Sequence, residues 1–323
     1  MAEEKNTSNI SYDSGEGVSV ISEKGEMLLR THVLKGKTIG ISISESDNLS
    51  ELGFGVPHLK DAVIEIARYI LASGGKLAYG GDMRQGGFTE LIFDLLAYYK
   101  ADKTLQPHER FYSYLAYPLS TTITIEKQAE LRQNVSFKKI EPPINLQIAN
   151  TNDFLKPDSP DNLYVWSRCL TKMREEMEVI CDARIFIGGR TKGFKGKSPG
   201  ILEELLIALE HKHPVYLVGA FGGITKDAIE ALKGNKPESF SNEYYFNNVD
   251  YKNMFLLFNG KHPNDTIDYP KYLSQLQQIG LNKIAEKNGL SVEDNLRLTS
   301  TSHLSEVVYL ILKGLTKCFT NKQ

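Results

Sequence analysis

The sequence has few cysteines, no long apolar run and almost no net charge. Its three cysteines fit no metal-ligand spacing, which favours a reducing compartment. No apolar run approaches the roughly 20 residues that a membrane helix needs. A formal net charge of -2 argues against a general nucleic-acid binder, which neutralises phosphates with Lys and Arg. The N-terminus is polar and acidic, unlike a signal peptide. We therefore expect a cytoplasmic protein without nucleic-acid or membrane partners.

The common site motifs are also missing. No G-x-G-x-x-G follows the first predicted strand, no Walker pattern occurs, and no Gly-x-Ser-x-Gly turn occurs. His58, His211 and His213 are scattered and form no metal set. For His211 and His213, which precede a predicted strand, capping or a surface position is favoured over ligation. We expect neither a metal nor a cofactor.

What the sequence does contain is a repeated order of apolar strand, glycine turn and amphipathic helix. Short apolar runs predict strands, and apolar residues at helical spacing follow most of them. This alternation predicts a Rossmann-like α/β fold, a doubly wound parallel sheet with helices on both faces. The predicted strands are 37–44, 76–79, 110–119, 183–187 and 213–219, and the predicted helices are 59–71, one from about 87, 163–181, 201–209 and 225–232.

Three regions follow from this pattern. Residues 1–35 lack a sustained period and predict a flexible or loosely docked arm, with simple disorder as the alternative. Residues 36–235 hold the strands and form the ligand-binding domain, in which 121–161 reads as surface insertions with one short helix. Residues 236–323 form a C-terminal helical appendage, with helices at 272–284 and 303–319, that we expect to pack on the core.

The stretch 182–209 is the centre of the functional interpretation. A buried strand ends at Gly188-Gly189-Arg190, a basic loop follows, and a helix begins at Gly200. This geometry directs free backbone N–H groups and a positive dipole end at an anion. Glu203-Glu204 lies in the first helical turn, where carboxylates would repel a bound anion. The alternative is equally weighted: acidic residues favour a helix N-terminus by themselves, and basic loops are commonly solvated.

Other loops are expected at the same edge of the sheet, because ligands in such folds bind beyond the carboxyl ends of the strands. Glycines there permit close backbone approach to a phosphate, and arginine can bind it through two hydrogen bonds. The alternatives are a helix-approach loop after the first strand, a tight turn with a surface arginine after the second, and an i, i+4 pair of Arg174 with Glu178. Arg174, which lies in the predicted helix 163–181, is expected to point to the same edge. With it, the candidate ligand-binding residues are Ser42, Ser44, Gly80, Gly81, Arg84, Gly86, Gly87, Arg174, Phe221 and Gly222.

These motifs resemble the SLOG superfamily. The resemblance rests on Tyr79-Gly80-Gly81-Asp82, on Gly188-Gly189-Arg190 and on 199–204, Pro-Gly-Ile-Leu-Glu-Glu. The superfamily includes the LONELY GUY phosphoribohydrolases, also called lysine decarboxylase-like, whose motif is Pro-Gly-Gly-x-Gly-Thr-x-x-Glu. Gly200, Ile201 and Glu204 align with its Gly-Thr and Glu, so the threonine is replaced and the Pro-Gly-Gly opening is missing. The stretch 220–223 is similar to SLOG domains that accompany TIR modules in bacterial defence proteins.

The resemblance implies two functions of different classes. As an N-glycosidase acting on a nucleotide or ADP-ribose-like compound, the chain would use Glu204, with Glu203, to stabilise a ribosyl cation or activate water. Asp82 would protonate or orient the leaving group. As a sensor, the same pocket would bind a nucleotide-derived messenger without turnover. A structural subunit with a vestigial pocket is the third option. We expect a homo-oligomer, assisted by an exposed aromatic stretch at 244–246, and a defence-system partner is compatible with the resemblance.

Overall fold

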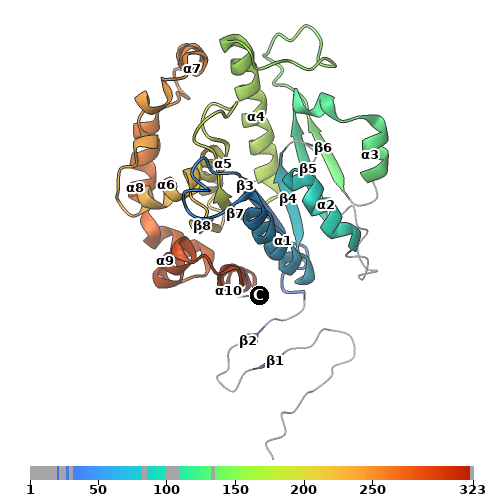
Figure 1. Ribbon diagram of the computed structural model, residues 1–323, viewed down its shortest axis with the longest axis vertical. Helices are drawn as coiled ribbons and strands as arrows, with labels where there is room; N and C mark the ends of the chain where they lie inside the picture. Colours follow the sequence, from blue (N-terminus) through green and yellow to red (C-terminus); the bar gives the residue numbers. More distant parts are fainter. Residues whose placement is uncertain are drawn as a thin grey trace, which may run out of the picture.

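A six-stranded parallel sheet forms the centre of the protein (Figure 1). The structure, a computed structural model, describes residues 20–21, 27–28, 32–81, 86–98, 110–131 and 135–320. Most of the expected arm, 1–35, lies outside these residues, and β1 (Val20–Ile21) and β2 (Met27–Leu28) within it pair antiparallel. The strands of the central sheet are β3 (Thr38–Ser44), β4 (Lys76–Gly80), β5 (Phe111–Ala116), β6 (Ser136–Ile140), β7 (Ala183–Gly188) and β8 (Val215–Val218).

The strand order is β6-β5-β4-β3-β7-β8, and every neighbouring pair is parallel. The chain adds β4, β5 and β6 on one side of β3 and then returns to add β7 and β8 on the other. The order in which the strands are added therefore reverses between β3 and β7, and we call this position the switch point. Ligands in open α/β sheets bind outside the carboxyl ends of the strands at such a point. The sheet confirms the predicted fold class.

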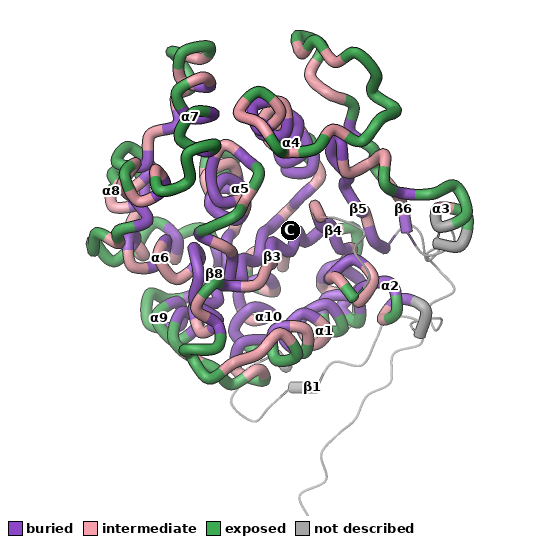
Figure 2. The backbone as a smooth tube through the Cα atoms, turned by 45° about the horizontal axis from the view of Figure 1, so that its top comes forward, coloured by how far each residue is buried: buried purple, intermediate pink, exposed green. Residues whose placement is uncertain are grey.

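Helices cover both faces of the sheet (Figure 2), as parallel strands require when they are apolar on both sides. On one face lie α1 (Val56–Ala72), α2 (Phe88–Tyr98) and α10 (Leu304–Thr320), and on the other lie α4 (Pro160–Ile180) and α5 (Gly200–Glu210). Alternate residues of β7 serve the two cores: Ile185 and Ile187 pack with α1 and α10, whereas Phe186 packs with α5 and α6 (Gly223–Leu232).

Residues after 235 form more helix than the sequence predicts. In addition to α8 (Tyr269–Asn288) and α10, the structure contains α7 (Val249–Lys261) and α9 (Val292–Ser300). Two 3-10 turns, η3 (Glu238–Phe240) and η4 (Glu243–Tyr245), connect α6 to α7. α7 packs on α4, α8 on α6, α9 on β8 and α10 on α1. These helices thus contribute to both cores, α7 and α8 to one and α9 and α10 to the other.

The segment 121–161 also differs from the prediction. It contains the expected short helix, α3 (Ile125–Leu131), and the 3-10 turn η2 (Leu119–Thr122) precedes it. It also contains β6, which is the edge strand of the sheet beside β5. Its sequence, Ser-Phe-Lys-Lys-Ile, carries two exposed lysines, a feature that keeps edge strands from pairing with other chains. The same lysines interrupt the apolar pattern, so the sequence does not predict this strand.

Candidate functional site

Three loops meet where β3, β7 and β8 end, and hydrogen bonds fix them together. The carboxylate of Asp47, in the loop after β3, accepts from the backbone N–H of Thr191 at 2.7 Å and from its hydroxyl at 2.8 Å. Ser46 Oγ donates to the carbonyl of Phe221 at 2.6 Å, which ties the first loop to the turn after β8. The Ile224 N–H bonds to Gly189 O at 3.0 Å. The carboxyl edge of the sheet is therefore a preformed platform at the switch point.

The glycines after β7 and β8 are explained by packing of these loops. Gly188, Gly189 and Gly222 have φ of +67°, +103° and +67°, which only glycine adopts readily. A Cβ on Gly188 would lie 2.5 Å from the Ser44 carbonyl oxygen, and one on Gly222 would lie 2.6 Å from Asn48 Oδ1. The missing side chains thus leave room for neighbouring protein atoms. Phe221, which we predicted to bind ligand, is 1% exposed and packs on Phe54 with ring centroids 5.1 Å apart.

The glycine segment after β4 is described only in part. Asp82 and Arg84 lie outside the described residues, so their predicted roles stay predictions. A Cβ on Gly80 would approach Met173 Sδ to 2.8 Å, and one on Gly81 would overlap the Tyr79 ring. Further along, Gly86 has φ +69° and donates its N–H to Glu90, while Gly87 precedes the first residue of α2.

Beside the switch point lies a group of buried ion pairs, which we name the buried charge cluster: Arg174, Glu178, Arg184, Glu203 and Glu204. Arg174, on α4, contacts both carboxylates of the first turn of α5. Its Nη1 bonds to Glu203 Oε2, and its Nε lies 3.5 Å from Glu204 Oε1. Glu203 Oε1 also accepts from the Thr171 hydroxyl. The i, i+4 pair of Arg174 with Glu178, which was the alternative to a ligand-binding role, does not occur, and Arg174 pairs with Glu203 instead.

Arg184 joins the rest of the cluster. It is fully buried on β7, where Nη1 bonds to Glu178 and Nη2 bonds to Glu204 and, at 2.6 Å, to the Ser42 hydroxyl. Ser42 in turn donates to Glu204 Oε2 at 2.6 Å. Burial alone would lower the pKa of Arg184, but Glu204, Cys181 and Glu178 raise it above its usual value. The surrounding carboxylates therefore stabilise the charged guanidinium against the cost of its burial.

Gly40 on β3 provides the space for this arginine. A Cβ on Gly40 would lie 2.5 Å from Cδ and 2.6 Å from Nε of Arg184, closer than real Cβ atoms approach. At the other end of the cluster, Glu178 Oε1 lies 2.6 Å from Nδ1 of His213, whose side chain is 22% exposed. His213 thus contacts the cluster through Glu178 from its partly exposed end, a role that the sequence did not indicate.

The cluster holds three carboxylates against two guanidiniums, and the side chains of Glu203 and Glu204 are 3% and 8% exposed. Buried charges are tolerated only when they are paired and hydrogen-bonded, so each of these groups depends on its partners. Arg184 was missed by the sequence analysis because it stands inside an apolar run. The apolar run could still have predicted the ion pair, because a charged residue on a strand that is buried on both faces needs a buried partner of opposite charge.

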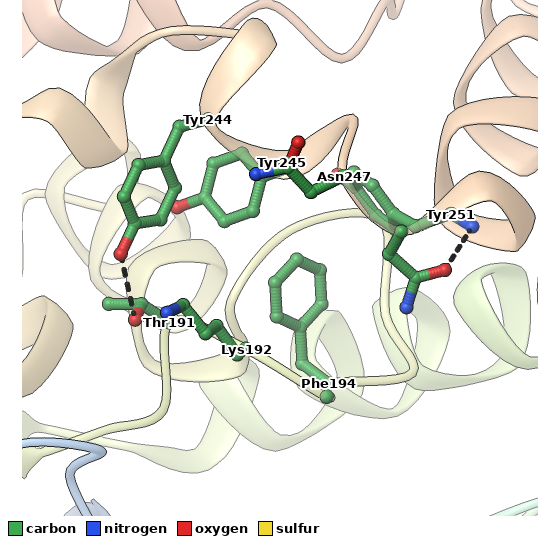
Figure 3. Close-up of a pocket in the computed structure, with 9 residues that line it drawn as sticks. Thr191, Lys192, Phe194, Tyr244, Tyr245, Asn247 and Tyr251 are labelled. Atoms are coloured by element: carbon green, nitrogen blue, oxygen red, sulfur yellow. Dashed lines mark hydrogen bonds between the residues drawn. The ribbon is translucent and has the colours of Figure 1, made fainter.

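Two cavities adjoin this region without containing the cluster. The first has a volume of about 360 Å³ and lies between the β7–α5 loop and residues 244–251 (Figure 3). The second has a volume of about 480 Å³ and lies between the loop after β3, the start of α6 and η3. Both are within the size range of small-molecule sites. They share Thr191, Lys192 and Tyr244, which form the wall between them.

The cationic side chains of the β7–α5 loop have separate surroundings. Arg190 pairs with Glu45 at 3.1 Å, and its side chain is 42% exposed. Lys197 pairs with Asp265 at 3.2 Å. Lys192 is exposed and lines both cavities, so of these three it is the cation placed to meet a ligand there. Ser44, whose hydroxyl accepts from the Arg190 N–H at 3.3 Å, supports this loop.

The aromatic stretch at 244–246 is not the exposed patch that we predicted. Tyr245 is 5% exposed and stacks on Tyr269 with centroids 4.3 Å apart, while Tyr244 and Phe246 are partly buried. The prediction was wrong because α7 and α8 cover this stretch.

Among the described residues, no group of His, Cys, Asp and Glu is arranged to hold a metal ion. Within the same residues, no helix is long and apolar enough to cross a membrane.

The topology defines a Rossmann-like α/β protein, and its two cavities lie beside the point where the strand order reverses, which is where open α/β sheets bind ligands. The chain belongs to the SLOG cluster2 family, whose model matches residues 33–298. The match includes α7, α8 and most of α9 as well as the sheet. No curated protein matches the sequence. Membership of the SLOG family indicates a nucleotide-related ligand.

Proposed function

We propose that this protein binds a nucleotide or ADP-ribose-related ligand in the two cavities at the carboxyl edge of the sheet, and that it retains the ligand without cleaving it. Family membership and the position of the cavities beside the β3–β7 switch point support the ligand class. One observation carries the absence of turnover: buried guanidiniums already bind both carboxylates that the sequence nominates for catalysis.

The argument depends on the four oxygens of these two carboxylates. Cleavage of an N-glycosidic bond needs a carboxylate oxygen that faces the ribose carbon or the attacking water. Glu203 uses one oxygen for Thr171 and the other for Arg174. Glu204 Oε2 accepts from Ser42 and Arg184, and Oε1 lies 3.5 Å from Arg174 Nε. Neither residue lines either of the two cavities described above. The pair thus supports the fold beside the site.

A ligand held at this position contacts two parts of the chain that are distant in sequence. The β7–α5 loop supplies Thr191 and Lys192, and the segment before α7 supplies Tyr244. Binding would therefore join the sheet to the C-terminal helices, which suits a sensor that changes assembly on ligation. We propose that the ligand is a nucleotide-derived messenger and that the response is assembly with further copies of this chain or with a defence-system partner.

Hydrolysis is the second candidate, and a specific observation favours it. Arg174 Nε is buried and makes no hydrogen bond within the described residues, and Glu204 Oε1 has only the 3.5 Å contact with it. These two atoms can each form a further hydrogen bond. If a ligand reached them, Glu204 could act as the general base that activates the attacking water.

Mass spectrometry distinguishes the two functions. The purified protein is incubated with adenosine monophosphate, NAD and ADP-ribose, and both retained ligand and released free base are measured. A retained, unchanged compound supports the sensor. Free base released by the natural protein and by the control Glu210→Gln, but not by Glu204→Gln, would establish hydrolysis. Glu210 is a suitable control because it is exposed at the end of the same helix.

A further inference from the structure

The two cavities are adjacent but differ in chemistry. The first is lined mainly by aromatic rings and amides, whereas the lining of the second is largely polar and includes four carboxylates. The wall between them is held by Thr191, whose hydroxyl lies 3.4 Å from the Tyr244 hydroxyl, and it carries the exposed side chain of Lys192 (Figure 3). A ligand longer than one cavity can thus extend past this wall into the other.

The first cavity, which we call the aromatic cavity, suits a planar heterocycle. Phe194 points into it between Tyr245 and Tyr251, with ring centroids 5.5 Å and 5.0 Å away and near-perpendicular planes (Figure 3). Stacking on aromatic side chains is a general way to hold a nucleobase. Asn247 and Asn248 add amide groups at the rim, and amides can hydrogen-bond a base edge. The aromatic cavity therefore has the features of a nucleobase site.

The second cavity, which we call the carboxylate cavity, has the opposite character to a phosphate site. It is lined by four carboxylates against two lysines, Lys192 and Lys226. Burial raises the pKa of one of the carboxyls, Asp227, which accepts from Ser239 at 2.6 Å. Ionised carboxylates only accept hydrogen bonds, so they suit sugar hydroxyls and repel phosphates. The four are Asp47, Glu51, Asp227 and Glu238.

We infer that the two cavities are compartments of one site, in which the aromatic cavity holds a nucleobase and the carboxylate cavity holds the hydroxyls of a sugar. Lys192, at the wall, meets the phosphates that link the two parts. The site therefore selects a nucleotide whose far end is a sugar over one that ends in a triphosphate. This inference rests on the proposed nucleotide-related ligand and specifies its class.

The test is calorimetric titration of the full chain with ADP-ribose, ATP and adenosine monophosphate. We expect ADP-ribose to bind at least about tenfold more tightly than ATP, because the triphosphate would lie among carboxylates. Phe194→Leu should weaken ADP-ribose binding about tenfold through lost stacking. Its control is Phe246→Leu, since Phe246 is partly buried at the edge of the same core but lines neither cavity.

Two further variants address the other compartment. The double variant Glu51→Gln with Glu238→Gln should raise ATP affinity about tenfold, because it removes two negative charges, while Glu243→Gln, an exposed residue outside both cavities, should leave it unchanged. Lys192→Gln should weaken ADP-ribose binding more than Lys195→Gln in the same loop.

The outcomes separate the two proposals. Failure of all three compounds to bind would overturn the proposed function, and with it this inference. ADP-ribose binding that is insensitive to Phe194→Leu would overturn the inference alone, as would ATP binding as tight as ADP-ribose. Since Phe194→Leu could also perturb folding, thermal denaturation of each variant accompanies the titrations, and the ligand ranking of the natural chain decides independently of any variant.

Discussion

Replacing Arg184 by methionine should destabilise the protein severely. The substitution keeps an unbranched stem but removes the guanidinium that binds Glu178 and Glu204. The cluster would then hold three carboxylates against one guanidinium. Removing one partner of a buried ion pair costs about 3–5 kcal/mol. Because two carboxylates lose their bond to Arg184 here, we expect the upper end of that range, a large part of the roughly 5–15 kcal/mol that stabilises a typical domain.

Urea denaturation at pH 7 measures this loss. The single tryptophan, Trp166, reports on it because it is buried on α4, the helix that also carries Glu178. A triple variant with Glu178→Gln and Glu204→Gln should recover much of the lost free energy of unfolding, since the unpaired charges are gone. An exposed control, Arg68→Met, should cost less than about 1 kcal/mol. An Arg184→Met protein as stable as the natural one would refute the role of charge pairing.

Three further predictions concern the rest of the fold. Gly40→Ala should destabilise the protein by at least about 1 kcal/mol through overpacking against the buried arginine, measured by the same denaturation, and an unchanged midpoint would contradict it. Burial raises the pKa of Cys169 and Cys181 to about 12, so at pH 8 iodoacetamide should modify the partly exposed Cys318 first, as read by peptide mass spectrometry. Burial also raises the pKa of Asp227, so its ionisation opposes folding as pH rises. Asp227→Asn should then raise the melting temperature near pH 8 and leave it unchanged near pH 3, and the reverse dependence would refute this.

The sequence predicts the sheet well because a parallel strand buried on both faces is a continuous apolar run. It fails at β6, an edge strand in which Lys138 and Lys139 interrupt the run. α7 was missed although Tyr251, Met254, Phe255 and Phe258 are spaced for one helical face, because the polar residues before them read as a connection.

The candidate site was predicted less completely than the fold. The first turn of α5 was singled out because carboxylates conflict with an anion site, and the structure places Glu203 and Glu204 beside the switch point, in the buried charge cluster. Their partners were not predictable from spacing. The contact of Ser42 with Arg184 depends on the register of β3 against β7, and that of Arg174 depends on how α4 packs on α5. Both are properties of the folded chain.

The position of α10 has a consequence for synthesis on the ribosome. This helix packs on α1 and places Val307, Leu310 and Ile311 in the same core as Ile39 and Ile41 of β3. The strand is made early, but the helix that completes its covering is made some 260 residues later, after every other strand of the sheet. Nascent chains fold from the N-terminus as they grow, and exposed apolar surface favours aggregation. Until α10 emerges, one face of the sheet stays partly uncovered, so we expect the incomplete chain to be more prone to aggregation than the finished one.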